Sequence, residues 1–506
     1  MAIRRLLLAT VTALALAGCG RKELGDADIV ALDAVTLRAE IAAGHVSALQ
    51  VTQAYLRRIA AVDESGPMLG AVIEVNPDAE AIARALDEQR ARGALGPLHG
   101  VPVLIKANID TADRMATSAG SLALAEHRAR DDADVVTRLR AAGAVVLGKT
   151  NLSEWANFRS TRSTSGWSSL GGQTRNPYVL DRNPCGSSSG SAVAVAAHLA
   201  PLAVGTETDG SIVCPAGVNG VVGIKPAIGT VSQSGIVPIA HSQDTAGPLA
   251  RTVADAALLL DVLAATGLPP AGPGSVAGLR VGVVRNFGGA GSDPAVETTF
   301  TAALRRLEAA GLVLVDPVMA ASPAELSNAE RLILVSEFKE DLAAYLAGVR
   351  TGPRTFAALI EYNESHAADV MPYFGQELFL AAHGGLGTAD PGYAGALERV
   401  RQQRAALAAL FRDRDLVALV APANGRAWRT DYAGGDSGAR VGSSRIAAIT
   451  GFPSIAVPAA LVDELPIGVA FVGQPQDEAR LIAIAAAFER ARGPFPEPKF
   501  LPMIAD

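Results

Sequence analysis

Short apolar segments rich in branched side chains alternate with amphipathic segments along most of this 506-residue chain. Strand-like segments occur at 101–105, 144–147, 202–205, 221–224, 281–284, 312–315, 417–420 and 467–472, and helix-like segments at 29–63, 78–92, 134–142, 191–200, 253–266, 295–310 and 477–490. Strands that alternate with helices are typical of α/β folds. The content of 49% hydrophobic residues is ample for a large core. We therefore predict a single large α/β domain with a mixed, mainly parallel central sheet covered by helices on both faces.

The first residues resemble an export signal rather than part of a fold. Arg4 and Arg5 precede an apolar run that is too short to remain as a membrane-spanning helix. The next residues, Leu16-Ala17-Gly18-Cys19, resemble a bacterial lipobox. An ordinary secretory signal cleaved after Ala17 is the alternative. Both interpretations place the mature chain outside the cytoplasm, and we expect it on the periplasmic side of a bacterial membrane.

These observations suggest a division of the chain. We expect residues 1–18 to be a lipoprotein-type signal peptide and Cys19 to carry the lipid. Residues 19–27 would form a tether, and residues 28–506 would form the domain. Within it we place the core at about 70–270 and the C-terminal half at 275–506, with a mostly helical cap at about 325–401.

Two serine clusters flanked by glycine lie in the middle of the chain. The first is Gly186-Ser187-Ser188-Ser189-Gly190-Ser191, and the second is Thr208-Asp209-Gly210-Ser211. Serine chemistry needs such glycines, because backbone N–H groups must closely approach the reacting carbonyl. Lys106 lies far upstream, at the end of the strand-like segment 101–105. Two serine clusters together with this lysine indicate serine chemistry more strongly than one cluster alone.

Two other motifs match known patterns but lack the required context. The segment Gly143–Thr150 fits the phosphate-loop expression, but its four middle residues are Ala, Val, Val and Leu, which favour a strand. The segment 186–190 fits a nucleophile elbow centred on Ser188, but a proline-rich loop precedes it where the elbow needs a strand. No local signature favours any of the three later histidines, which are His241, His366 and His383. We therefore predict neither nucleotide binding nor a histidine triad.

A series of landmarks, taken in order, resembles the amidase signature family over about residues 47–496. The landmarks are Gly100–Lys106, Gly148–Trp155, the two serine clusters, Gly223–Pro226, Asp244–Pro248, Thr450–Pro453 and Pro466–Gly468. The resemblance implies the fold of that family and the hydrolysis of amides. It further implies Ser211 as the nucleophile, Ser187 as a bridging serine that follows a cis peptide bond, and Lys106 as the base.

These roles fit the chemistry of the residue types. Serine is a poor nucleophile unless a base lies within hydrogen-bonding reach. Lysine is a base only when neutral, and burial favours that form because desolvation destabilises the ammonium group. Ser187 could relay a proton from Ser211 to Lys106 and then return one to the departing nitrogen. The oxyanion hole would consist of the backbone N–H groups of Thr208, Asp209, Gly210 and Ser211.

The second serine cluster departs from the commoner family pattern, Asp-x-Gly-Gly-Ser-Ile-Arg. Here Asp209 stands in place of a glycine, and Val213 stands in place of the arginine. These departures, together with the signal segment, point away from the amidotransferase that acts on glutamyl-tRNA. The pattern is most similar to the peptide amidase branch, which removes the C-terminal amide from peptides and releases ammonia. An aryl-acylamidase or an aliphatic amidase of the same family remains an alternative, as does a non-catalytic ligand-binding lipoprotein.

The remaining composition limits partners and cofactors. A net charge of −7 and a pI near 5.6 argue against a nucleic-acid partner. The motifs that hold metals or cofactors are absent from the sequence, so we expect no cofactor and no metal. The expected substrate is a small-molecule or peptide amide, and the expected membrane contact is only through Cys19.

Cys185 and Cys214 each lie within three residues of a candidate serine. An oxidising compartment would permit a bridge between them, but we favour two small buried thiols.

Overall fold

The computed structural model describes residues 24–93, 95–264, 275–320, 323–439 and 441–504. The predicted signal peptide and the lipid site at Cys19 lie outside these ranges. The strands are β1 (Val72–Val75), β2 (Pro102–Lys106), β3 (Val145–Thr150), β4 (Trp167–Ser168), β5 (Gly172–Gln173), β6 (Leu202–Glu207), β7 (Val222–Lys225), β8 (Thr245–Ala250), β9 (Arg280–Val284), β10 (Val313–Val318), β11 (Ala418–Pro422), β12 (Ser454–Val462) and β13 (Leu465–Val472).

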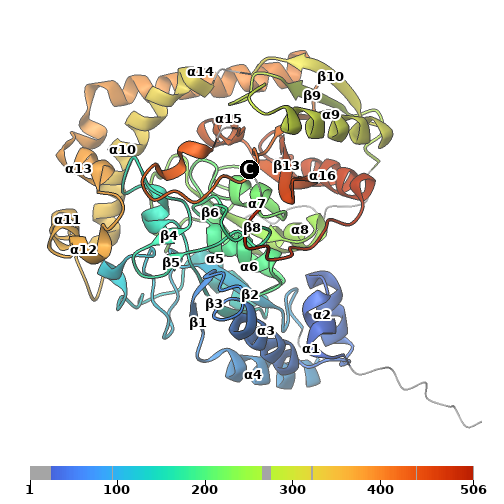
Figure 1. Ribbon diagram of the computed structural model, residues 1–506, viewed down its shortest axis with the longest axis vertical. Helices are drawn as coiled ribbons and strands as arrows, with labels where there is room; N and C mark the ends of the chain where they lie inside the picture. Colours follow the sequence, from blue (N-terminus) through green and yellow to red (C-terminus); the bar gives the residue numbers. More distant parts are fainter. Residues whose placement is uncertain (1–23, 94, 265–274, 321–322, 440, 505–506) are drawn as a thin grey trace, which may run out of the picture.

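The helices surround these strands, as Figure 1 shows. They are α1 (Asp26–Ala31), α2 (Ala34–Ala42), α3 (Ala48–Val62), α4 (Ala79–Ala91), α5 (Asp134–Ala141), α6 (Ser189–Ala196), α7 (Val213–Val218), α8 (Val253–Leu263), α9 (Pro294–Ala309), α10 (Pro323–Ala347), α11 (Phe356–Ser365), α12 (Ala367–Val370), α13 (Glu377–Gly384), α14 (Pro391–Asp413), α15 (Ser444–Thr450) and α16 (Glu478–Arg492). Among the described helices, none combines the length and apolar character needed to cross a bilayer.

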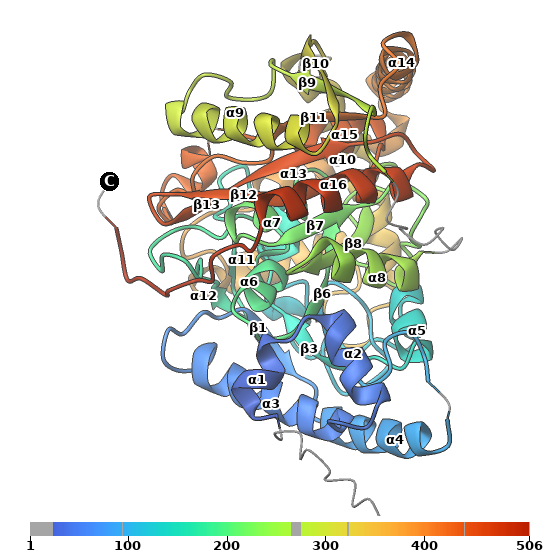
Figure 2. The same cartoon turned by 90° about the vertical axis from the view of Figure 1, so that its right-hand side faces the viewer.

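One sheet of eleven strands runs through the domain in the order β1-β3-β2-β6-β8-β7-β12-β13-β11-β9-β10. The strands β3, β2 and β6 are parallel to one another, and so are β11, β9 and β10. The strands between these two blocks pair antiparallel, as does β1 with β3. Figure 2 shows helices α1–α4 at one end of the molecule and α9 with β9 and β10 at the other.

The predicted single α/β domain with a mixed sheet is confirmed, but parallel pairing occupies less of the sheet than we expect from the sequence. Of the six antiparallel pairings in the described sheet, five involve β1, β8 or β12, which the apolar pattern does not identify as strands. Gly247 and Pro248 lie within β8, and Pro458 lies within β12. Both residue types are uncommon inside strands, so these segments resemble loops in the sequence.

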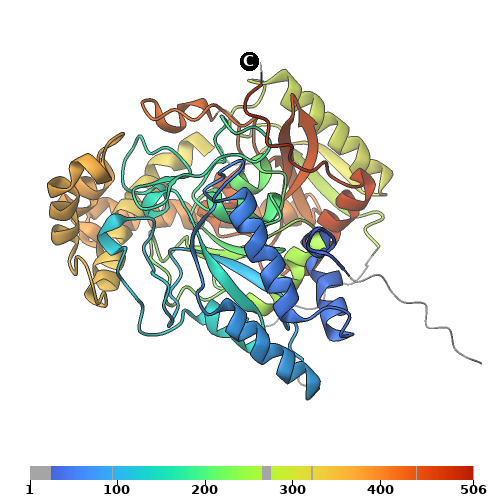
Figure 3. The ribbon, with the colours of Figure 1, turned by 60° about the horizontal axis from the view of Figure 1, so that its bottom comes forward.

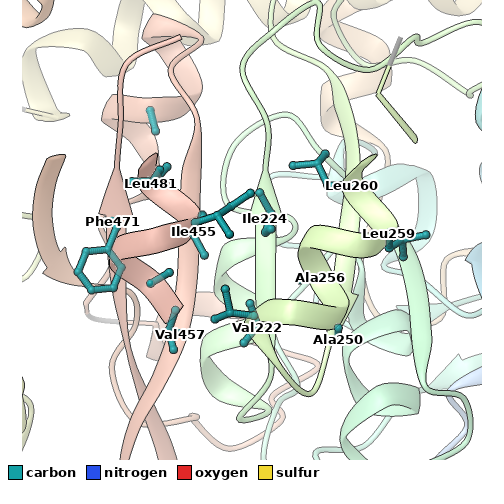
Figure 4. Close-up of a cluster of buried hydrophobic side chains, with 14 of the residues drawn as sticks. Val222, Ile224, Ala250, Ala256, Leu259, Leu260, Ile455, Val457, Phe471 and Leu481 are labelled. Carbon is teal, nitrogen blue, oxygen red and sulfur yellow. The ribbon is translucent and has the colours of Figure 1, made fainter. Parts of the chain in front are cut away.

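Alternate residues of the strands point to opposite faces of the sheet, and helices cover both faces. In β2, Val103 and Ile105 belong to a core that includes residues of α5, α8, α9 and α16. Leu104, between them, belongs to a second core that includes residues of α3, α4 and α6. Figure 4 shows part of the first core, where Ile224 of β7 and Leu260 of α8 are buried. The helix periodicity in the sequence is thus confirmed for both layers.

Residues 323–413 form a helical segment between β10 and β11, and this segment spans the range for which we predict a helical cap. Phe338 of α10, Phe356 of α11 and Phe379 of α13 pack together in a core that this segment shares with residues near 119–124, 155 and 237–240. Figures 1 and 3 both show α11–α13 projecting to one side of the sheet. The long helix α14 returns along α10 and contacts α15.

Candidate active site

Lys106 is the last residue of β2, and its side chain is fully buried. Its Nζ lies 2.7 Å from Ser187 Oγ, 3.1 Å from Ser188 Oγ and 2.8 Å from Thr206 Oγ1. No carboxylate among the described residues forms an ion pair with it. Burial therefore lowers the pKa of Lys106 to about 7, although the more distant Asp244 and Glu207 oppose this shift. The site can thus hold this amine in its neutral form near neutral pH.

Ser187 is held against Lys106 by an unusual backbone turn. The Gly186–Ser187 peptide bond is cis, as the family resemblance implies. Gly186 is needed at this position because a β-carbon there would lie 2.1 Å from Ser153 Oγ. The N–H of Ser153 donates to the Ser187 carbonyl at 3.1 Å. These contacts fix the backbone on both sides of the Ser187 hydroxyl.

Ser188, the centre of the apparent nucleophile elbow, makes structural hydrogen bonds. Its hydroxyl donates to the Thr206 carbonyl at 3.0 Å and accepts from the Thr206 N–H at 3.1 Å. Its backbone N–H donates to the Ser211 carbonyl at 3.1 Å. Ser188 therefore joins the two serine clusters, and the elbow interpretation does not fit its contacts.

The second serine cluster forms a tight turn between β6 and α7. Gly210 has a φ of +79°, a value that other residues rarely adopt. Among the described residues, no acceptor is found for the backbone N–H groups of Asp209, Gly210 and Ser211. Ser211 is 7% exposed, whereas Lys106 and Ser187 are 0% exposed. The turn thus offers unpaired N–H donors beside Ser211. Of Lys106, Ser187 and Ser211, only Ser211 is accessible to solvent.

Two acidic residues for which the sequence predicted no role hold this turn. The Glu207 carboxylate accepts the N–H groups of Ile212 and Val213 at 2.7 and 3.0 Å, and thereby caps the start of α7 directly after Ser211. Thr208 Oγ1 donates to Asp244 at 2.6 Å, and burial raises the pKa of Asp244 to about 6. The role of Glu207 could have been predicted from its position, because it is an acidic residue at the end of a buried strand.

The other polar residues near the sequence motifs make no direct contact with Lys106 among the hydrogen bonds of the described residues. Lys149 is buried in β3, where its Nζ donates to the Ile109 carbonyl, and residues 145–150 form a strand rather than a phosphate loop. Asn108 donates to Thr206 Oγ1 at 3.1 Å and so supports the group that accepts from Lys106. His241 pairs with Asp341 at 2.9 Å on the surface. His366 stacks on Tyr362, and His383 lies against Phe356.

The structure corrects the prediction that Cys185 and Cys214 are free thiols. The two residues form a disulfide, with their Cα atoms 6.1 Å apart. Cys185 precedes the cis bond at Gly186, and Cys214 follows Ser211 by three positions. The fold brings the two clusters together, and a separation of 29 residues in the sequence could not reveal this proximity. The bridge therefore connects the segments that carry the two candidate serines.

The comparisons with known proteins agree with this geometry. The profile of the family described as Amidase matches residues 50–482. The structure of native peptide amidase from Stenotrophomonas maltophilia superimposes with a TM-score of 0.88 and 46% identity over 93% of this chain and 99% of that one. A probable amidase of Arabidopsis thaliana is 38% identical over 481 residues, which are 89% of this chain and 88% of the relative. A putative amidase of Arthroderma benhamiae is 35% identical over 503 residues, which are 90% of this chain and 81% of the relative.

This chain belongs to the amidase signature family, as the sequence landmarks indicated. It is an amide hydrolase, and a serine nucleophile is standard for its family. The single α/β domain of the structure is the fold of that family.

We predict that the Cys185–Cys214 bridge stabilises both the fold and the site. Replacing both cysteines with alanine should lower the free energy of unfolding by about 3 kcal/mol, because the unfolded chain regains the freedom of the closed loop. Amide hydrolysis should fall several-fold, since the bridge links the segments that bear Ser187 and Ser211. Urea denaturation and amidase assays with and without reductant measure both effects. The double variant is its own control, because reductant should not change it, and equal stability of the variant and the oxidised protein would contradict the prediction.

Proposed function

We propose that this protein hydrolyses the C-terminal amide of peptides and releases ammonia, with Ser211, Ser187 and Lys106 as its catalytic residues. The main support is the buried Lys106 amine, which lies 2.7 Å from Ser187 Oγ and whose pKa is lowered to about 7. The substrate class is supported by the similarity to the peptide amidase of Stenotrophomonas maltophilia. Asp209, where the commoner family pattern has glycine, also favours this branch.

The hydrogen bonds around Lys106 indicate which hydroxyl exchanges a proton with it. A neutral amine has two N–H donors and one lone pair. The Ser188 hydroxyl already donates to the Thr206 carbonyl, so it accepts from Lys106. Ser187 Oγ makes the shortest contact with Nζ, at 2.7 Å. When the amine is neutral, its lone pair can accept the Ser187 O–H at this distance. Ser187 can then accept the proton that Ser211 loses.

The reaction proceeds in two stages through an acyl-enzyme. The Ser211 Oγ–carbon bond forms as the Ser211 proton passes to Ser187 and the Ser187 proton passes to Lys106. The negative charge on the substrate oxygen is stabilised by the free N–H groups of the turn at 208–211. The C–N bond then breaks as Ser187 protonates the nitrogen, and ammonia departs. Water attacks the acyl-enzyme with the same residues as base, which yields the peptide acid and restores Ser211.

We predict that the protein releases ammonia from peptide amides, and that Ser211→Ala reduces kcat/KM by about 10⁴-fold or more. The measurement is ammonia release from a panel of peptide amides, fatty amides and anilides. A fluorophosphonate probe should label the wild-type protein and not Ser211→Ala.

Ser189→Ala serves as the matched control, because Ser189 belongs to the first cluster but its hydroxyl donates to the Cys185 carbonyl. This variant should still be labelled. Undiminished labelling of Ser211→Ala would disprove the nucleophile assignment. Turnover of anilides or fatty amides with no peptide amide hydrolysed would instead disprove the substrate class.

The pKa of Lys106 predicts the acidic side of the pH profile. Because the base must be neutral, its active form is lost as the pH falls below about 7. We expect kcat/KM for an uncharged amide to fall about tenfold per pH unit below this value. The Lys106→Met variant should lose about 10²–10⁴-fold at pH 8 and show no such limb. A wild-type profile that is flat between pH 5 and pH 8 would contradict Lys106 as the base.

We further propose that the mature protein is exported and attached to a bacterial membrane through a lipid on Cys19. The segment Leu16–Cys19 supports this proposal, and the Cys185–Cys214 disulfide fits an oxidising compartment. In cells fed a labelled fatty acid, the wild-type protein should acquire the label and sediment with membranes, whereas Cys19→Ala should do neither. A labelled Cys19→Ala protein would contradict the proposed site.

A further inference from the structure

The side chain of Asp209 binds residues at the start of α15. Its Oδ1 accepts a hydrogen bond from Ser444 Oγ at 2.6 Å, and its Oδ2 lies 3.3 Å from Arg445 Nε. Both partners begin α15, more than 230 residues along the chain. The turn that carries Ser211 is therefore tied to α15 through the residue that departs from the commoner family pattern.

Glu330 of α10 reaches the same turn from the helical segment. Its Oε2 lies 3.1 Å from the same Arg445 Nε, and its Oε1 accepts from Gln243 Nε2 at 3.3 Å. Gln243 Nε2 also lies 3.4 Å from the Thr208 carbonyl. The helices α10 and α15 lie side by side (Figure 1), so one glutamate connects both of them to residues 208 and 209.

This cluster contains more acidic than basic groups. The carboxyl groups of Asp209 and Glu330 lie 3.3 and 3.1 Å from the same atom, Arg445 Nε. Two carboxylates this close to one guanidinium nitrogen repel each other when both are charged. The charged groups that face Glu330 are Asp209 from the turn after β6 and Arg445 from α15. Glu330 is 5% exposed, and its burial together with Asp209 raises its pKa to about 8, against the effect of Arg445. One arginine, one carboxylate and one protonated carboxyl leave the cluster neutral.

We propose that Glu330, Arg445 and Asp209 are positioning residues that hold the Ser211 turn in its reactive geometry through the guanidinium group that both carboxyl groups contact. This inference rests on the proposed role of Ser211 as the nucleophile. When Glu330 loses its proton, two carboxylates face one arginine, and their repulsion displaces Asp209 together with its backbone N–H. The turn then loses its alignment with the substrate oxygen, and the reaction slows as the pH rises.

The experiment measures the rate at which a fluorophosphonate probe labels Ser211 between pH 6 and pH 10, because this rate does not depend on which amide is the substrate. For the wild-type protein we expect a rise through about pH 7 as Lys106 loses its proton, then a decrease of about threefold or more between pH 8 and pH 10. Glu330→Gln cannot lose a proton, so its rate should stay high up to pH 10. Asp209→Asn removes the repulsion from the other side and should also abolish the decrease.

Glu340→Gln is the matched control. Glu340 lies on the same helix α10, but its carboxylate accepts from Thr388 at the surface. This variant should keep the wild-type decrease. A decrease of unchanged size and midpoint in both Glu330→Gln and Asp209→Asn would overturn the inference, as would a uniform loss of rate at every pH in folded Glu330→Gln. The absence of any labelling in the wild-type protein would instead contradict the proposed role of Ser211.

Discussion

The chemistry proposed for this protein depends on the Lys106 amine, which is buried without a paired carboxylate among the described residues. In water an amine of this kind carries a proton and cannot act as a base. The apolar sheet around Lys106 removes that solvation, and hydroxyl groups of Ser187, Ser188 and Thr206 take its place. A carboxylate beside Nζ would restore the charge, so the acids of the site, such as Asp244, act on the backbone turns instead.

The components of the site that are local in sequence could be predicted. Lys106 follows an apolar segment, and Ser187 and Ser211 lie among glycines, so the residue types and their neighbours make them candidates, and the family resemblance suggests their roles. The structure brings Lys106 and Ser187 into contact, and it places the Ser211 turn beside them through Ser188. Glycine, proline and β-branched residues influence the backbone within a few positions of themselves. The strand before Lys106 and the turns around the two serines can therefore be predicted from one sequence.

The remaining components could not be predicted, because their partners are remote in the chain. Asp209 meets Arg445 across 236 positions, and no periodicity or spacing connects them. The same holds for Cys185 and Cys214, since a cysteine's surroundings in sequence do not reveal whether another thiol lies within bonding distance. The strands β8 and β12 were missed for another reason. Their prolines and glycine lower strand propensity, but pairing with both neighbouring strands outweighs that preference.

The position of the helical segment at 323–413 has an evolutionary consequence. It leaves the sheet after β10 and returns at β11, and both of these strands pair with β9. The strands β10 and β11 can therefore pair with β9 whatever the length of the segment between them. Doubling the length of such a connection costs only about 0.6 kcal/mol of loop-closure entropy. Helices α11–α13 can be added, removed or reshaped while α10, which carries Glu330, and the strands β2 and β6 with Lys106 and Thr206 stay intact. A family built in this way can acquire new specificities in these helices without having to rebuild its chemistry.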